Sequence, residues 1–198
     1  MKFTKGYWMN LPGVTNTDAV QVREVKVEND RVYLYTVPYH ADMRAMGGPL
    51  LEMYISSPQP DIIRTEAYHF MGSNQKMPAF ELNDAHCALE VENTETTVTI
   101  KSGNTKLVIG KNPCSFDYYY KDKKLTSVGN RFGSAMISTV STPDGNYMRA
   151  QMDLDIGEKV YGLGERFTPY VKNGQTVETW NEDGGTCTEI SYKSIPFY

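Results

Sequence analysis

Apolar and polar positions alternate with a period of two along much of the chain, and no segment sustains a helical period. The alternation predicts short β-strands, most of them with one buried face and one polar face. Polar, glycine-containing turns separate the strands at regular intervals. This arrangement is typical of an antiparallel β-sandwich, so we predict an all-β fold.

Two strands in the first half of the chain have a distinctive pattern. Val20, Val22, Val25 and Val27 alternate with a slip near Glu24, which predicts a β-bulge.

The next strand, residues 32–37, carries apolar or aromatic side chains at both sets of alternate positions. This pattern predicts a strand that is buried on both faces or covered by a second sheet. Residues 42–53 show no clear period, and we interpret them as a loop. A further strand is predicted to begin at Leu89 and Val91.

The second half predicts a hairpin followed by more antiparallel strands. Val98 and Ile100 form one arm, the Ser-Gly-Asn run at 102–104 forms the turn, and Leu107 and Ile109 form the other arm. Alternation also continues over residues 116–120 and over residues 148–156, each beside a polar turn. Because there is no internal repeat or low-complexity linker, we expect one domain over residues 1–198.

Composition narrows the possible functions. The 20 basic and 24 acidic residues give a net charge of −4 without a concentrated basic face, so we expect no nucleic-acid partner. No segment reaches the roughly 20 apolar residues that span a bilayer, and the first residues lack the apolar core of a signal peptide. We therefore expect no membrane association and a cytoplasmic location.

The cysteines favour neither a disulfide framework nor a metal site. Cys87, Cys114 and Cys187 are odd in number, far apart and without a Cys-x-x-Cys pair. We expect no metal and no cofactor.

From residue 157 onward the composition shifts to glycine, asparagine, threonine and aromatic residues. Gly162-Leu-Gly164 is reminiscent of a dinucleotide-binding turn. The third glycine is missing, however, and Pro169 falls where the helix should run, which excludes that interpretation.

Several motifs in this segment are more specific, and they run in the order Val160-Tyr-Gly-Leu-Gly-Glu-Arg-Phe167, Asn173-Gly-Gln-Thr-Val-Glu-Thr-Trp-Asn181, Asp183-Gly-Gly185 and Ile195-Pro-Phe-Tyr198. Together with Gly6-Tyr-Trp8 and Pro12-Gly13 near the start, they resemble the N-terminal domain of glycoside hydrolase family 31, especially its bacterial α-xylosidase branch. The resemblance extends over the whole chain and is strongest after Val160.

The resemblance implies a galactose-mutarotase-like β-sandwich that precedes a catalytic β/α-barrel. It also implies retaining hydrolysis of α-xylosides or α-glucosides by two aspartates of the barrel, which must lie about 5 Å apart across the glycosidic bond. This sequence contains nothing like the family's nucleophile motif, and the family's sandwich continues past the position of Tyr198. We therefore expect an inactive domain, incomplete at its C-terminal end, whose partner is its own catalytic barrel.

One site residue follows from the resemblance. A loop at about 180–190 is expected to reach the rim of the barrel pocket, where Asp183 would accept hydrogen bonds from sugar hydroxyls. The alternative is that Asp183 only caps a turn beside two glycines. Trp180 suits a domain interface better than sugar stacking, and Glu165 with Arg166 could orient the loop or the interface.

Two other functions compete with an accessory domain. The tyrosine, tryptophan and asparagine content suits an independent carbohydrate-binding module. An aldose epimerase-like enzyme would need a histidine acid and a glutamate base, with only His40, His69 and His86 available. We interpret His69 as structural and His86 as a loop residue. We also expect self-association into a homo-oligomer through unpaired strand edges and apolar surface.

Overall fold

The computed structural model describes residues 3–5, 9–38, 48–70, 85–128, 130–131, 134–181 and 192–198. These residues gather into two compact units, one of residues 12–153 and one of residues 1–11 with 154–198. All the regular elements in the described part of the chain are strands, as the sequence predicts. The expectation of one domain over residues 1–198 stays a prediction.

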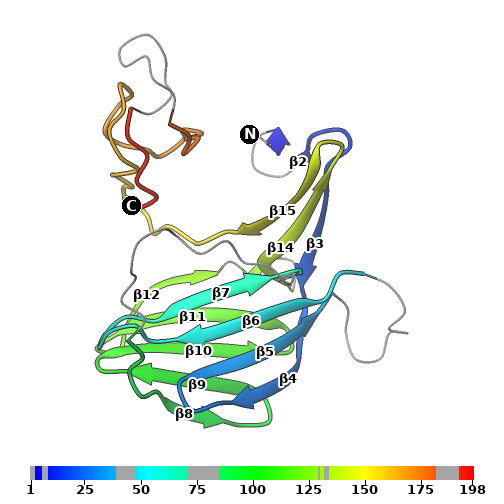
Figure 1. Ribbon diagram of the computed structural model, residues 1–198, viewed down its shortest axis with the longest axis vertical. Coiled ribbons are helices and arrows are strands. Elements are labelled where there is room, and N and C mark those ends of the chain that lie inside the picture. The colour runs from blue at the N-terminus through cyan, green and yellow to red at the C-terminus, as the bar shows by residue number, and fades with distance from the viewer. Residues whose placement is uncertain are drawn as a thin grey trace. The chain divides into compact units, whose positions relative to one another are not determined.

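The described residues of the larger unit form three antiparallel sheets (Figure 1). The first sheet is formed in order by β4 (Gln21–Val27), β5 (Arg31–Val37), β6 (Leu51–Ser56) and β7 (Arg64–Tyr68). The second is formed in order by β12 (Lys123–Val128), β11 (Cys114–Tyr120), β10 (Thr105–Lys111), β9 (Thr97–Ser102) and β8 (Glu90–Asn93). In the third, β14 (Ser134–Thr142) pairs with β13 (Asn130–Arg131), β15 (Gly145–Ala150) and β3 (Thr15–Ala19).

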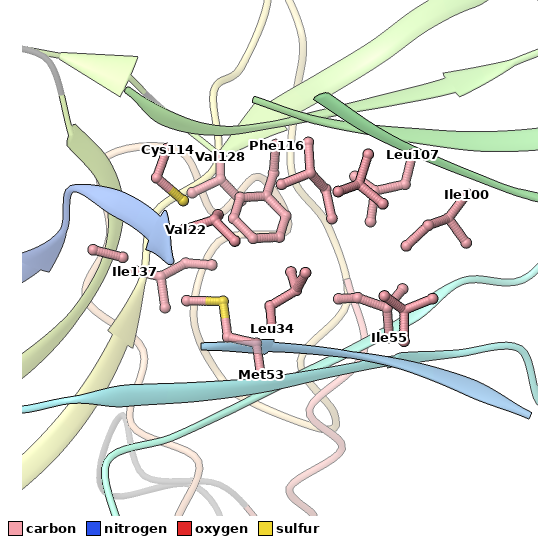
Figure 2. Packing of buried hydrophobic residues seen from close by; sticks show 14 of the residues in the cluster. Val22, Leu34, Met53, Ile55, Ile100, Leu107, Cys114, Phe116, Val128 and Ile137 are labelled. Atoms are coloured by element: carbon pink, nitrogen blue, oxygen red, sulfur yellow. The ribbon is translucent and has the colours of Figure 1, made fainter. Parts of the chain in front are cut away.

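The hydrophobic core lies between the first two sheets. Alternate side chains of β5 and β6, such as Leu34 and Met53, face alternate side chains of β9, β10 and β11, such as Phe116 (Figure 2). Phe116 is 0% exposed. Each fully buried side chain of this size contributes about 1.5–3 kcal/mol to stability, so this shared core makes the two sheets a sandwich.

Cys87 and Cys114 are free thiols. Cys114 lies in the core, and burial raises its pKa to about 12 because the apolar surroundings disfavour the thiolate. Cys187 lies outside the described residues.

Three of the predicted local features are confirmed. The register of β4 against β5 shifts between Val22 and Glu24, which is the predicted bulge. The β9–β10 hairpin turns at residues 103–104, and its four predicted apolar residues are fully buried. The strand predicted from Leu89 and Val91 is β8.

Other predictions were wrong in extent. The strand predicted over residues 148–156 ends at Ala150, and Ile156 is 101% exposed. The alternation of apolar and polar residues continues past Ala150, so the period of two does not by itself show where the strand ends. The loop predicted over 42–53 includes the start of β6 at Leu51, and residues 39–47 lie outside the described part.

The prediction for residues 32–37 was half right. Val32, Leu34 and Thr36 are buried in the core, as a strand of this sandwich requires. On the opposite face Val37 is buried as well, but Tyr33 and Tyr35 are only half-buried.

The smaller unit contains the two short strands β1 (Thr4–Lys5) and β2 (Met9–Asn10) and the C-terminal segment. In that segment, regular strands give way to loops that are joined by individual hydrogen bonds. No helix in the described residues is long and apolar enough to cross a membrane.

Candidate functional site

A glycine turn organises the motif-rich C-terminal segment. Gly162, Leu163 and Gly164 all have left-handed backbone conformations, with φ of 87°, 69° and 90°. A side chain at Gly164 would place its Cβ 2.1 Å from the Lys193 carbonyl oxygen, so only glycine fits there.

The turn is fastened to residues 193–197 by backbone hydrogen bonds. Leu163 N donates to Phe197 O at 2.8 Å, and Glu165 N donates to Lys193 O at 2.8 Å. The two halves of the motif, which are some 30 residues apart in sequence, therefore lie side by side.

A second set of hydrogen bonds orders residues 168–173 and joins Asn173 to residues 158–160 at the start of this segment. Lys172 is buried, and its Nζ donates to Thr168 Oγ1 at 2.9 Å and to Pro169 O at 2.8 Å. Asn173 accepts from Val160 N at 2.8 Å and donates to Glu158 O at 3.0 Å. Asn173 belongs to a recognised motif, but Lys172 could not be predicted from the sequence, because a lysine that is buried by loops leaves no periodic signal.

Asn181 fixes the base of the loop that is expected to contact substrate. Its Oδ1 accepts a hydrogen bond from Ser194 N at 2.7 Å, so the two ends of the intervening segment are held together. Asp183, the one predicted substrate-binding residue, lies outside the described residues, as do positions 182–191 as a whole. Its role stays a prediction.

Arg166 lies directly after the glycine turn. Its Nε donates to Leu163 O at 2.9 Å, which directs the guanidinium back under the turn. Beside it is a pocket of about 250 Å³, the Arg166 pocket, which is also lined by Gly162, Gly164, Thr168, Tyr170 and Lys172. Glu165, the other residue predicted to orient this region, lines the same pocket.

The smaller unit exposes many large apolar side chains. Trp180 is 69% exposed and Tyr170 is 88% exposed. Others of this kind are Tyr161, Phe167, Tyr192, Phe197 and Tyr198. Such exposure is unusual for side chains of this size, and aromatic residues are enriched where proteins bind one another.

The described histidines do not form an acid–base pair with a carboxylate in a pocket. His69 is exposed just after β7, so the structural role predicted for it in a strand was wrong. It lines a surface pocket of about 510 Å³ with Phe70, Tyr147 and other residues, none of which carries a carboxylate. His86 Nε2 lies 3.8 Å from Asp30 Oδ2 in an exposed pair, and His40 is outside the described part.

A row of tyrosines crosses the outer face of β5, β6 and β7. Tyr33 donates to Glu52 at 3.0 Å, and Tyr68 donates to Glu66 at 3.0 Å. Desolvation and the hydrogen bond to a carboxylate raise the pKa of both phenols. Tyr54 packs between the two rings.

Cations lie over the first two rings of this row, with Lys26 over Tyr33 and Arg31 over Tyr54. The hydroxyls of Tyr33 and Tyr68, and one face of the rings of Tyr33 and Tyr54, therefore have partners within the sheet. The row does not present a free stacking platform, and an independent carbohydrate-binding module stays a prediction.

Among the described residues there is no group of three or more His, Cys, Asp or Glu side chains that could hold a metal ion. Self-association and a cytoplasmic location also stay predictions.

Comparisons with known proteins identify the fold class first. The chain superimposes on an uncharacterized protein of Listeria monocytogenes with a TM-score of 0.71 at 20% identity, over 92% of this chain and 16% of that one. It matches the family 31 dextranase of Flavobacterium johnsoniae with a TM-score of 0.64 at 17% identity, over 91% of this chain and 21% of that one. The fold is thus the antiparallel β-sandwich that the sequence predicts.

Sequence comparisons then identify the family. Residues 52–198 match the model of the glycosyl hydrolase 31 N-terminal galactose mutarotase-like domain, and the chain belongs to this family. It is 33% identical to an α-xylosidase of Lactiplantibacillus pentosus and 33% identical to an α-xylosidase of Emericella nidulans, over 100% of this chain in both. It spans 26% and 28% of the length of these two relatives.

Proposed function

We propose that this chain is the N-terminal accessory domain of a retaining α-xylosidase that hydrolyses terminal α-xylosidic bonds. The observation that carries the proposal is the 33% identity to two α-xylosidases over the whole chain. In this role the domain supports the catalytic barrel, contributes the loop at about 180–190 to the substrate pocket, and does no chemistry itself.

The described surface supports a division of labour between domain and barrel. Retaining hydrolysis needs two carboxyl groups about 5 Å apart in a cleft that encloses the sugar. Glu90 and Glu92 share a shallow pocket, but they are exposed on β8, an outer strand of its sheet among the described residues. Among the described residues, this pocket is lined only by side chains of β8 and β9, which do not enclose a sugar ring.

The smaller unit suits a supporting role. Its exposed aromatic side chains can pack against a neighbouring domain, where they would be removed from water. The bond between Asn181 and Ser194 gives the loop a fixed base. A loop with a fixed base loses less conformational entropy when it binds substrate.

A hydrolysis assay tests the proposal. The 198-residue chain should release no phenolate from an aryl α-xyloside or an aryl α-glucoside, and the longer protein that contains it should prefer the xyloside. Turnover by the chain alone that survives repurification contradicts the proposal.

An Asp183→Asn substitution in the longer protein tests the loop. If the carboxylate binds sugar hydroxyls, the loss of a charge-assisted hydrogen bond should lower kcat/KM about tenfold. Asp155→Asn, in an exposed turn of the same unit, is the matched control and should leave kcat/KM unchanged. If the two variants have the same kcat/KM, Asp183 only caps a turn and does not bind the sugar.

A further inference from the structure

A pocket lies where the end of β7 approaches β15 in the larger unit. We name it the His69 pocket. Its volume is about 510 Å³, which is within the range of small-molecule sites. Two segments line it, residues 67–70 at the end of β7 and residues 146–148 of β15. Because His69 and Asn146 are exposed, the pocket is open to ligands from solution.

Aromatic rings form much of the pocket wall. Phe70 is 85% exposed, and Tyr147 is half-buried on the β15 side. Tyr68 is held in place, because its hydroxyl donates to Glu66 and its ring packs edge-on against another ring in the sheet. A ligand with an apolar face can pack on rings of this kind and remove them from water.

Two polar side chains line the same pocket. They are the amide of Asn146 and the imidazole of His69. An amide and a neutral imidazole can each donate and accept a hydrogen bond. A hydroxyl group also donates and accepts, so it can pair with either of them. A ligand that carries several hydroxyl groups can therefore bind both side chains at once.

Other classes of ligand fit the pocket less well. Apart from His69, none of the described lining residues has a side chain that is charged at neutral pH. An ionised ligand would therefore lose hydration without gaining a counter-ion. A purely apolar ligand would cover Asn146 and His69 and leave their polar groups without partners, which is costly. A neutral ligand with both an apolar face and hydroxyl groups avoids both costs.

We propose that the His69 pocket binds a neutral saccharide. The C–H face of a sugar ring stacks on Phe70 and Tyr147, and its hydroxyl groups form hydrogen bonds with Asn146 and His69. The proposal goes beyond the accessory role proposed above and does not depend on it, because the pocket lies wholly within residues 12–153. Such a site binds a saccharide chain without any chemistry.

An NMR titration of the 198-residue chain tests the proposal. The methyl groups of methionine and alanine are isotope-labelled, and cellotetraose or maltotetraose, two neutral saccharides of different shape, is added. The methyl signals of Met148 and Ala67, which line the pocket, should shift saturably with at least one of them. The methyl signal of Met9, which is exposed in the smaller unit, should not shift.

Three variants show which side chains bind the saccharide. Phe70→Ala removes the exposed ring and should raise Kd about tenfold. Asn146→Ala removes the amide and should raise Kd about fivefold. Tyr170→Ala is the matched control, because this ring is 88% exposed but belongs to the smaller unit, and it should leave Kd unchanged. An unchanged signal of the buried Met53 methyl group shows that each variant is folded.

Three outcomes overturn the proposal. The first is no saturable shift of Met148 and Ala67 with either saccharide. The second is an equal loss of affinity in Phe70→Ala and Tyr170→Ala, which shows that sugars stack on any exposed ring. The third is tighter binding of tetragalacturonate, which has a carboxylate on each ring, or of cyclohexanol, which assigns the pocket to an ionised or an apolar ligand. None of these results alters the hydrolysis assay that tests the accessory role.

Discussion

The sandwich of residues 12–153 and the C-terminal segment of residues 154–198 are stabilised by different kinds of interaction. The sandwich buries alternate side chains of two facing sheets in one core. The C-terminal segment is joined by single hydrogen bonds at the glycine turn, at Lys172 and at Asn181. The sandwich buries side chains such as Phe116 and Leu34 completely, while the segment exposes Trp180, Tyr170 and others.

This difference shows how stability and function are divided in the chain. Burial is non-directional and sums over many side chains, so a sandwich tolerates variation at any one exposed position. A segment joined by a few directional bonds depends on each of them, but its exposed surface remains available for a partner. Binding residues are often found on loops that a rigid scaffold positions.

The largest effect should come from opening a cavity in the sandwich. Phe116→Ala removes a fully buried ring from the core and should lower the free energy of unfolding by about 3–5 kcal/mol. Urea unfolding followed by circular dichroism measures this loss. Leu125→Ala, on the exposed face of β12, is the control and should cost no more than about 0.5 kcal/mol. Similar costs for both variants would refute a core centred on Phe116.

A smaller and local effect should follow from Gly164→Ala. The added methyl group would meet the Lys193 carbonyl, so residues 163–165 should separate from residues 193–197 while the sandwich remains folded. Amide exchange of Leu163 and Glu165 should become fast, whereas that of Leu107 in β10 should not change.

Gly174→Ala shows how much of the effect of Gly164→Ala comes from the steric clash and how much from a left-handed backbone conformation. Gly174 has φ of 75°, but no atom lies within 4 Å of a Cβ built there, so this variant should cost only about 1 kcal/mol. If the two glycine variants behave alike, close packing of the turn is not what Gly164 provides.

The smallest effect should come from Asn181→Ala. It removes the acceptor for Ser194 N, and a single exposed hydrogen bond contributes about 1 kcal/mol, which corresponds to roughly fivefold faster exchange of the Ser194 amide. Asn181→Asp keeps an oxygen acceptor and should preserve most of the protection. Loss of protection in both variants would mean that the amide group has a further role.

The β-hairpin and the bulge could be predicted because their signals are local. Val98, Ile100, Leu107 and Ile109 alternate around a glycine turn, and the slip near Glu24 is visible as a change in alternation. The end of β15 could not be predicted in this way. Residues 152–156 keep the alternation, but beyond Asp153, whose N–H donates to Ser127 O of β12, they pair with no strand among the described residues.

The candidate site was predictable only as a stretch of chain. The motifs from Val160 onward pointed to the correct family, and the family match confirms this. Which residues fasten it was not visible in the sequence. Lys172, Asn181 and Arg166 act through partners that are 3 to 13 residues away along irregular backbone, where no period links them.

The sequence by itself determined the all-β class, the main strand-forming stretches and the family, because period-two patterning and motif spacing are properties of the chain alone. Only the tertiary structure decided which faces meet in the core, how residues 160–166 pair with residues 193–198, and that Arg166 lines a pocket. These features depend on contacts between distant residues, and their energies arise only when folding brings those residues together.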